Sequence, residues 1–158
     1  MNMRYTRRNE ETEQIMVIQW AQYNQNRYPC LKWLHHCPNG GNRNHAEAVK
    51  LKQMGVKSGI SDLCLPYPAG IYCGLYIEMK YGDNRLQNTQ KEFLKDMSET
   101  GHFVATCYTA EAAVDVLKKY LKLQKNETMD FPNNSVFGRQ TTGGGTECGT
   151  HGRGWKNA

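Results

Sequence analysis

Apolar positions along the chain divide it into helical and extended segments. Apolar residues spaced three and four apart predict helices over residues 10–26, 44–54, 87–100 and 110–122. Short apolar runs bounded by Gly, Pro or Asn predict strands over residues 30–37, 60–65, 71–80 and 102–108. This order of elements predicts an α/β domain in which helices flank a small mixed central sheet.

The two ends of the chain have a different pattern. Residues 1–9 are basic and polar, so we expect a flexible basic arm there. Glycine is concentrated between Gly138 and Gly154, in a segment that offers almost nothing to bury. We therefore expect the folded domain to cover residues 10–122 and a disordered, Gly-rich tail to cover residues 123–158.

Composition narrows the class of protein. Lys and Arg number 20 and Asp and Glu 15, which leaves a net charge of +5. This surplus is compatible with a polyanionic partner such as nucleic acid, without establishing one. No apolar run approaches the ~18 residues of a membrane span, and no apolar stretch follows the basic N-terminus as in a secretory signal. We expect a cytoplasmic protein with no membrane partner.

Most of the six cysteines lie in apolar segments, where reduced thiols behave as small hydrophobic side chains. The segment CLKWLHHC allows another interpretation, a zinc site built on Cys30, His35 and Cys37. Its spacing is not that of a structural zinc site, in which paired ligands lie two to four residues apart. Zinc binding remains an alternative hypothesis.

Charged residues lie at the ends of two apolar strands. Asp62 lies in the first strand, and Glu78 and Lys80 share one face of the second, with Met79 facing the opposite side. If the strands pair, the two carboxylates come together and repel each other unless a cation lies between them. Carboxylates are ligands that Mg²⁺ or Mn²⁺ prefers, and a lysine beside them can act on an attacking water. The alternative is an ordinary cross-strand ion pair at the surface.

Two polar residues on helices could complete such a site. Gln90 lies on the helix face that carries Phe93 and Leu94, where an apolar residue is expected. Glu13 shares a stripe with Val17 and could be an outer metal ligand. The alternatives are a solvent-facing Gln at a helix end and an acidic residue in the first turn that complements the helix dipole.

Several residues could contact a phosphate backbone. A Pro-Asn-Gly-Gly loop leads into the second helix, whose N-terminus could approach a phosphate. The candidates for this contact are His36, Asn39, Gly40, Gly41, Arg43, Lys57 and Arg85. A plain loop and a solvated basic face are the alternatives.

The order of these segments resembles a known family. An N-terminal helix with a glutamate is followed by HHCPNGGNR, GVKSGISDLCLP, GLYIEMK and RLQNTQKEFL. Together they look like the VRR-NUC domain, the virus-type replication–repair branch of the PD-(D/E)XK nuclease superfamily. The similarity covers roughly residues 10–122. The resemblance implies a restriction-endonuclease-like core with a divalent-metal site.

The resemblance also assigns roles. Asp62, Glu78 and the carbonyl of Met79 would bind Mg²⁺ or Mn²⁺, and Lys80 would act on the water. Gln90 matches the family's helix glutamine. Glu13 matches its N-terminal glutamate, with Glu10 and Glu11 close enough in register to compete. One departure is Ser61, where the superfamily's motif has proline.

The implied function is a metal-dependent endonuclease that hydrolyses DNA. Short stand-alone members, mostly from phages or bacteria, are similar to dimeric enzymes that cleave branched DNA, including four-way (Holliday) junctions. We therefore expect a homodimer acting in replication, recombination or repair in a bacterial or phage-infected cell. The alternative is a nucleic-acid-binding protein whose nuclease-like site is inactive.

Overall fold

The structure is a computed structural model that describes residues 7–39 and 44–140. Its α-helices are α1 (Glu10–Tyr23), α2 (His45–Gln53), α3 (Asn88–Glu99) and α4 (Ala110–Lys122), with a 3₁₀ helix η1 (Pro29–Trp33) between the first two. Its strands are β1 (His35–His36), β2 (Leu63–Leu65), β3 (Leu75–Met79), β4 (Phe103–Cys107) and β5 (Ser135–Phe137). None of these helices is long and apolar enough to cross a membrane.

The strands form one mixed sheet in the order β1-β2-β3-β4-β5. β1, β2 and β3 pair antiparallel, whereas β3, β4 and β5 pair parallel. Leu63 of β2 pairs with Ile77 of β3, and Glu78 pairs with Thr106 of β4. The expected α/β fold with a mixed central sheet is confirmed.

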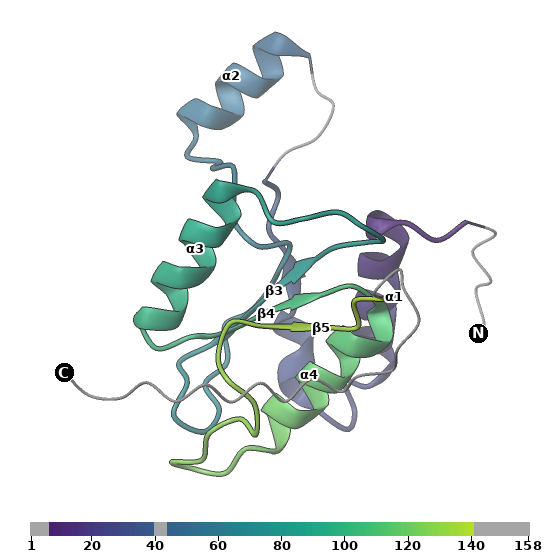
Figure 1. The fold of residues 1–158 in the computed structure, drawn as a ribbon, viewed down its shortest axis with the longest axis vertical. Coiled ribbons are helices and arrows are strands. Elements are labelled where there is room, and N and C mark those ends of the chain that lie inside the picture. Colours follow the sequence, from purple (N-terminus) through teal and green to yellow (C-terminus); the bar gives the residue numbers. More distant parts are fainter. Residues whose placement is uncertain (1–6, 40–43, 141–158) are drawn as a thin grey trace.

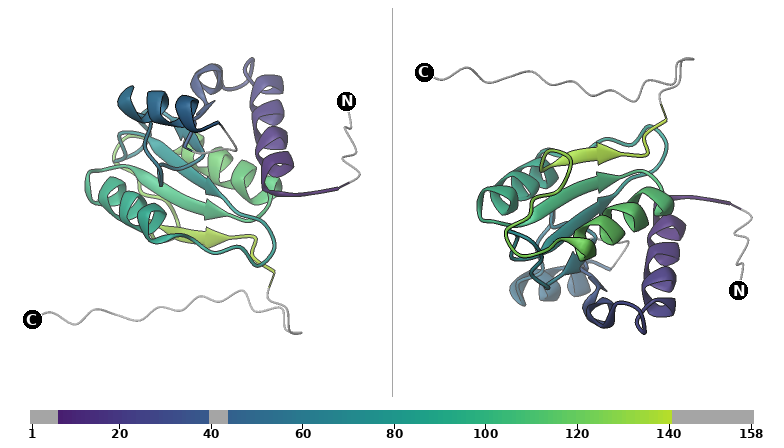
Figure 2. Two further views of the ribbon diagram at one scale, coloured as in Figure 1. Left: turned by 90° about the horizontal axis from the view of Figure 1, so that it is seen from above. Right: turned by 90° about the horizontal axis from the view of Figure 1, so that it is seen from below.

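Helices cover the two faces of the sheet unequally. Figures 1 and 2 show α3 on one face and α1 with α4 on the other. Figure 1 also shows α2 standing clear of the sheet, which agrees with its lack of buried residues. Every second side chain of β3, namely Leu75, Ile77 and Met79, points into the core that the sheet shares with α1 and α4. Glu78, which lies between them, therefore faces α3.

The expected helices agree with the observed ones to within a few residues, but the strand expected over residues 30–37 is wrong for most of its length. Residues Pro29–Trp33 form η1, and only His35 and His36 pair with β2. Pro29 has the fixed φ that suits the first helical position, and Leu31 and Leu34 are buried from this tight turn. The apolar residues of this segment therefore pack against the core from a 3₁₀ helix and not from an extended strand.

The fold continues beyond the expected boundary at residue 122. In residues 123–140, β5 extends the sheet beside β4, and Met129 is buried in the core. The side chain of Asn133 accepts a hydrogen bond from Val104 N–H and donates one to the carbonyl of His102. The expectation of a disordered tail from residue 123 is therefore corrected for this segment, and residues 141–158 lie outside the described part of the chain.

Candidate active site

Strand pairing brings the two predicted carboxylates together. Asp62 immediately precedes β2, opposite Glu78 of β3, because Leu63 pairs with Ile77. Asp62 Oδ2 accepts a hydrogen bond of 2.8 Å from the backbone N–H of Met79. Asp62 is therefore held against the end of β3, on the face from which Glu78 projects.

Lys80 and Gln90 bind the same oxygen of Glu78. Lys80 Nζ lies 2.7 Å from Glu78 Oε1, and Gln90 Nε2 donates to that oxygen at 2.5 Å. Gln90 Oε1 accepts from the N–H of Gln87 at 2.9 Å, so the start of α3 fixes the orientation of the amide. The second oxygen, Glu78 Oε2, is buried and has no hydrogen-bond partner among the described residues.

A third carboxylate reaches this cluster from α1. Glu10 Oε1 lies 3.6 Å from Lys80 Nζ, and Glu10 Oε2 accepts from the side chain of Asn84 at 3.2 Å. The sequence predicts Glu13 as the outer metal ligand from this helix, with Glu10 close enough in register to compete for that role. The contacts place Glu10, the first residue of α1, beside Lys80.

Two close approaches hold the segment that precedes Asp62. Gly59 has φ +86°, and a Cβ there would lie 2.7 Å from Cβ of Thr89 in α3. Only glycine allows both this conformation and this approach. Asn39 donates to the carbonyl of Ile60 and lies 3.5 Å from Asp62 Oδ1. The segment is thereby fixed between α3 and the strand edge.

The electrostatics of the site oppose ionisation of both carboxyl groups. Burial, followed by the charge of Asp62, raises the pKa of Glu78 from 4.5 to about 7. Burial also raises the pKa of Asp62, against the hydrogen bond from Met79. Burial by itself lowers the pKa of Lys80, but the hydrogen bond with Glu78 and the surrounding carboxylates outweigh it, so the pKa of Lys80 is raised. Lys80 is therefore an ammonium group at neutral pH.

This donor set fits a hard divalent cation. A buried carboxylate oxygen without a partner costs free energy unless a cation or a donor satisfies it. A divalent cation would also offset the repulsion between Asp62 and Glu78. The described residues contain no group of three His, Cys, Asp or Glu side chains gathered for one metal. Two carboxylates leave coordination positions for water and phosphate, as Mg²⁺ sites do.

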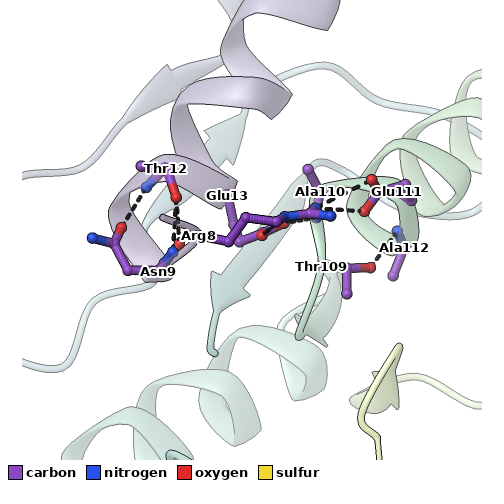
Figure 3. Close-up of polar contacts among 8 residues, drawn as sticks. All are labelled: Arg8, Asn9, Thr12, Glu13, Thr109, Ala110, Glu111 and Ala112. Atoms are coloured by element: carbon purple, nitrogen blue, oxygen red, sulfur yellow. Dashed lines mark hydrogen bonds and ion pairs between the residues drawn. The ribbon is translucent and has the colours of Figure 1, made fainter. Parts of the chain in front are cut away.

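Glu13 lies in a different set of contacts, which Figure 3 shows. Arg8 donates to it from Nε at 2.5 Å and from Nη2 at 2.7 Å, and the N–H of Ala110 donates to Oε2 at 2.6 Å. Arg8 also pairs with Glu111 at 3.0 Å. Glu13 thus joins α1 to the start of α4, and Arg8, expected in a flexible arm, is held there. Its metal-ligand role stays a prediction.

Only some of the residues predicted to contact phosphate lie beside the candidate active site. Among them, His36 Nδ1 lies 2.8 Å from the carbonyl of Asp62, and Asn39 lies beside the Asp62 side chain. Lys57 and Arg85 are exposed. Gly40, Gly41 and Arg43 lie outside the described residues. Two of the candidates therefore contact Asp62 directly, and sequence reasoning had no signal for that contact.

Comparisons with known proteins show the family to which the chain belongs. The family model of the VRR-NUC domain matches residues 8–111. A solved structure described as a VRR_NUC domain protein is 28% identical, covering 75% of this chain and 92% of that chain with a TM-score of 0.63. No curated protein matches. The family match covers well over half of the chain and contains every residue of the cluster around Glu78. The chain belongs to the VRR-NUC domain family, a family of nucleases.

Proposed function

We propose that this protein is an endonuclease that hydrolyses DNA phosphodiester bonds with Mg²⁺ or Mn²⁺. The observation that carries the proposal is the buried, partly unsatisfied carboxylate of Glu78, which faces Asp62 beside the Lys80 ammonium. A carboxylate with a purely structural role is expected to accept hydrogen bonds at both of its oxygens. Membership in a nuclease family, whose superfamily generally uses a divalent metal, supports the assignment.

Each residue has a distinct role in this proposal. Asp62, Glu78 and the carbonyl of Met79 hold the metal, which when bound supplies Lewis-acid stabilisation of phosphate charge. Lys80, as an ammonium group, orients the attacking water and offsets developing negative charge. Gln90 is a positioning residue that fixes Glu78 through their 2.5 Å hydrogen bond.

Glu10 is proposed to be the α1 carboxylate that would serve the metal site. Its 3.6 Å contact with Lys80 supports this, whereas the oxygens of Glu13 already accept from Arg8 and Ala110. Glu10 would act as the outer carboxylate that the family places on its N-terminal helix. Glu13 then serves mainly to attach α1 to α4.

The substrate is proposed to be branched DNA, with a four-way junction as the case to test. Exposed Lys57 and Arg85 would neutralise phosphates, and His36 and Asn39 lie where a strand would approach Asp62. Because one small domain has one such cluster, symmetric cutting of two strands favours a homodimer. The proposed compartment is the cytoplasm of a bacterial or phage-infected cell, where the five cysteines among the described residues would stay reduced.

Cleavage by the wild type and by Asp62→Ala tests the proposal. Labelled four-way junctions and linear duplexes are incubated with Mg²⁺, Mn²⁺ or EDTA. We expect metal-dependent cutting by the wild type, faster on the junction, and none by the variant or in EDTA. Cutting that persists in Asp62→Ala would refute the site. Equal cutting of both substrates would keep the nuclease and remove the branch preference.

The same samples distinguish the inactive alternative. Wild-type protein that binds the junction in EDTA but never cuts it in either metal would be a nucleic-acid-binding protein with a silent site. Thermal unfolding with and without Mg²⁺ gives an independent readout, because ligand binding to the folded state raises Tm. A metal-dependent increase in the wild type that is absent in Asp62→Ala would still locate the metal at this cluster.

A further inference from the structure

A cavity lies at the opposite end of α1 from the candidate active site. It has a volume of about 410 Å³, and the side chains that line it include Arg27, Tyr28, Lys32, Trp33 and Tyr67. α1 begins at Glu10, beside Lys80, and ends at Tyr23, so its length separates the two places by about 20 Å. The roles assigned above leave this cavity unused.

Aromatic rings are unusually accessible around this cavity. Trp33 is 59% exposed and Tyr67 is 43% exposed. Trp33 is the last residue of η1, whose Leu31 is buried and carries the packing of that turn. Trp33 therefore contributes little to the packing of the core, and its exposed indole is available as contact surface for a ligand.

Each of two rings carries its own cation. Lys32 Nζ lies 4.9 Å from the centroid of the Trp33 ring, and the Arg27 guanidinium lies 5.4 Å from that of Tyr28. The residues described as lining the cavity include no Asp or Glu. An aromatic surface with cations and without carboxylates is complementary to a ligand that is both planar and anionic.

The backbone that presents these rings is already fixed. Tyr67 accepts a 2.8 Å hydrogen bond at its carbonyl from the hydroxyl of Tyr120, and its N–H donates to the carbonyl of Leu65. Leu34 N–H donates to the carbonyl of Leu31 at the end of η1. The backbone around the cavity therefore needs little ordering when a ligand binds, which lowers that part of the entropic cost of association.

We propose that this cavity binds an unpaired nucleotide of single-stranded DNA. A base stacks on Trp33 and Tyr67, and the adjoining phosphates lie against Lys32 and Arg27. The choice of DNA as the polymer rests on the proposed function. The length of α1, about 20 Å, corresponds to about six nucleotides at the ~3.4 Å rise of a stacked strand, so a single-stranded arm of a few nucleotides can reach the cavity while its junction lies at the candidate active site.

Binding is tested without cleavage, in EDTA. Fluorescence anisotropy of a labelled oligothymidine of about twelve nucleotides is followed with the full-length wild type and with Trp33→Ala, Trp33→Phe, Lys32→Ala and Lys95→Ala. Lys95 is an exposed lysine on α3, paired with Glu99, and serves as the matched control for Lys32. We expect Trp33→Ala to weaken binding about 5-fold to 100-fold and Trp33→Phe to retain most of it.

Salt dependence separates stacking from charge. Lys32→Ala should reduce the slope of log affinity against log salt by about 0.7, whereas Trp33→Ala and Lys95→Ala should leave it unchanged. Equal affinity of Trp33→Ala and wild type would overturn the proposal, as would a wild type that does not bind the oligonucleotide. A Trp33→Ala variant that changes only the oligomeric state would assign the surface to contact between copies. Loss of cleavage has no bearing on these outcomes, so the two proposals fail separately.

Discussion

Two buried glutamates show how differently this fold treats the same side chain. Glu13 and Glu78 are both fully buried; Glu13 lies in the first turn of α1, and Glu78 lies near the end of the central strand β3. Glu13 accepts from Arg8 at both oxygens and also from Ala110 N–H. Glu78 has two donors on one oxygen and none among the described residues on the other. The two side chains are equally buried, but in the described part of the chain only Glu13 has hydrogen-bond donors at both carboxylate oxygens.

The difference separates a structural carboxylate from one that is available for chemistry. Glu13 is neutralised by Arg8 and completes the N-terminus of α4, where an anion is favourable. Glu78 lies beside another carboxylate, and burial with that charge raises its pKa to about 7. The fold thus gives up stability at Glu78 and gains it at Glu13. The following predictions test this contrast.

The largest expected effect is on cleavage by Glu78→Gln. The amide keeps the shape of the side chain and removes the anionic ligand, so cleavage should fall about 10²-fold to 10⁴-fold in single-turnover assays with Mg²⁺. Asp130→Asn is a matched surface control, since Asp130 pairs only with Lys119 in the contacts described for it. Cleavage by Glu78→Gln within a few-fold of wild type would show that Glu78 is not a metal ligand.

The same variant should be more stable than the wild type at pH 8 without metal. Because the folded-state pKa of Glu78 is raised from 4.5 to about 7, the folded wild type binds more protons and loses stability as pH rises through that interval. Glu78→Gln lacks this loss, so its free energy of unfolding should exceed that of wild type by about 1–3 kcal/mol at pH 8 and by much less at pH 4.5. Urea denaturation in EDTA at the two pH values measures it, and an equal difference at both would contradict the assignment.

Glu10→Gln and Glu13→Gln provide the next test. Glu10→Gln should slow cleavage about 10-fold to 100-fold with little change in stability, because Glu10 is part-exposed and contacts Lys80. Glu13→Gln should lower the free energy of unfolding by about 1–3 kcal/mol, because Arg8 loses its buried anionic partner and keeps only the exposed Glu111. Cleavage is compared per folded molecule, with circular dichroism as the check on folding. The reverse pattern would return the metal-ligand role to Glu13.

The sequence predicted the central cluster because local rules determine it. Two apolar strands that end in Asp62 and in Glu78 with Lys80 can pair in few ways that keep their apolar faces inward, and this register brings the charges together. The inward-facing Gln90 was also recognisable from helix periodicity. Their catalytic roles stay predictions, but their proximity follows from strand and helix geometry.

The choice between Glu10 and Glu13 could not follow from periodicity. The two residues are one turn apart on α1, and their environments differ through Arg8 and through the start of α4, about a hundred residues later in the chain. The same limit applies to β5: three residues among Asn and Gly carry little strand signal, and pairing with β4 supplies it. Contacts between segments distant in the sequence determine both the environments of the two glutamates and the formation of β5.

The smallest expected effect tests whether an unsatisfied buried oxygen is enough to mark a functional group. The Ser61 hydroxyl, like Glu78 Oε2, is buried without a partner among the described residues. It is neutral and cannot replace a carboxylate as a strong ligand. Ser61→Ala should therefore raise the free energy of unfolding by up to about 1 kcal/mol, because the desolvated hydroxyl disappears, and leave the cleavage rate within two-fold or so of wild type.

Thermal unfolding and the junction assay, run in parallel on Ser61→Ala and Glu78→Gln, make this comparison direct. At pH 8 without metal both variants should be more stable than wild type, but only Glu78→Gln should lose cleavage and the Mg²⁺-dependent increase in Tm. A Ser61→Ala variant that is less stable than wild type would mean that the hydroxyl has an unrecognised partner. One that loses cleavage without unfolding would place Ser61, the residue before Asp62, in the reaction itself. Glu78 then differs from Ser61 by its charge, since each has a buried oxygen that lacks a partner among the described residues. Ser61→Ala measures the effect of the missing partner alone, and Glu78→Gln measures it together with the effect of the charge.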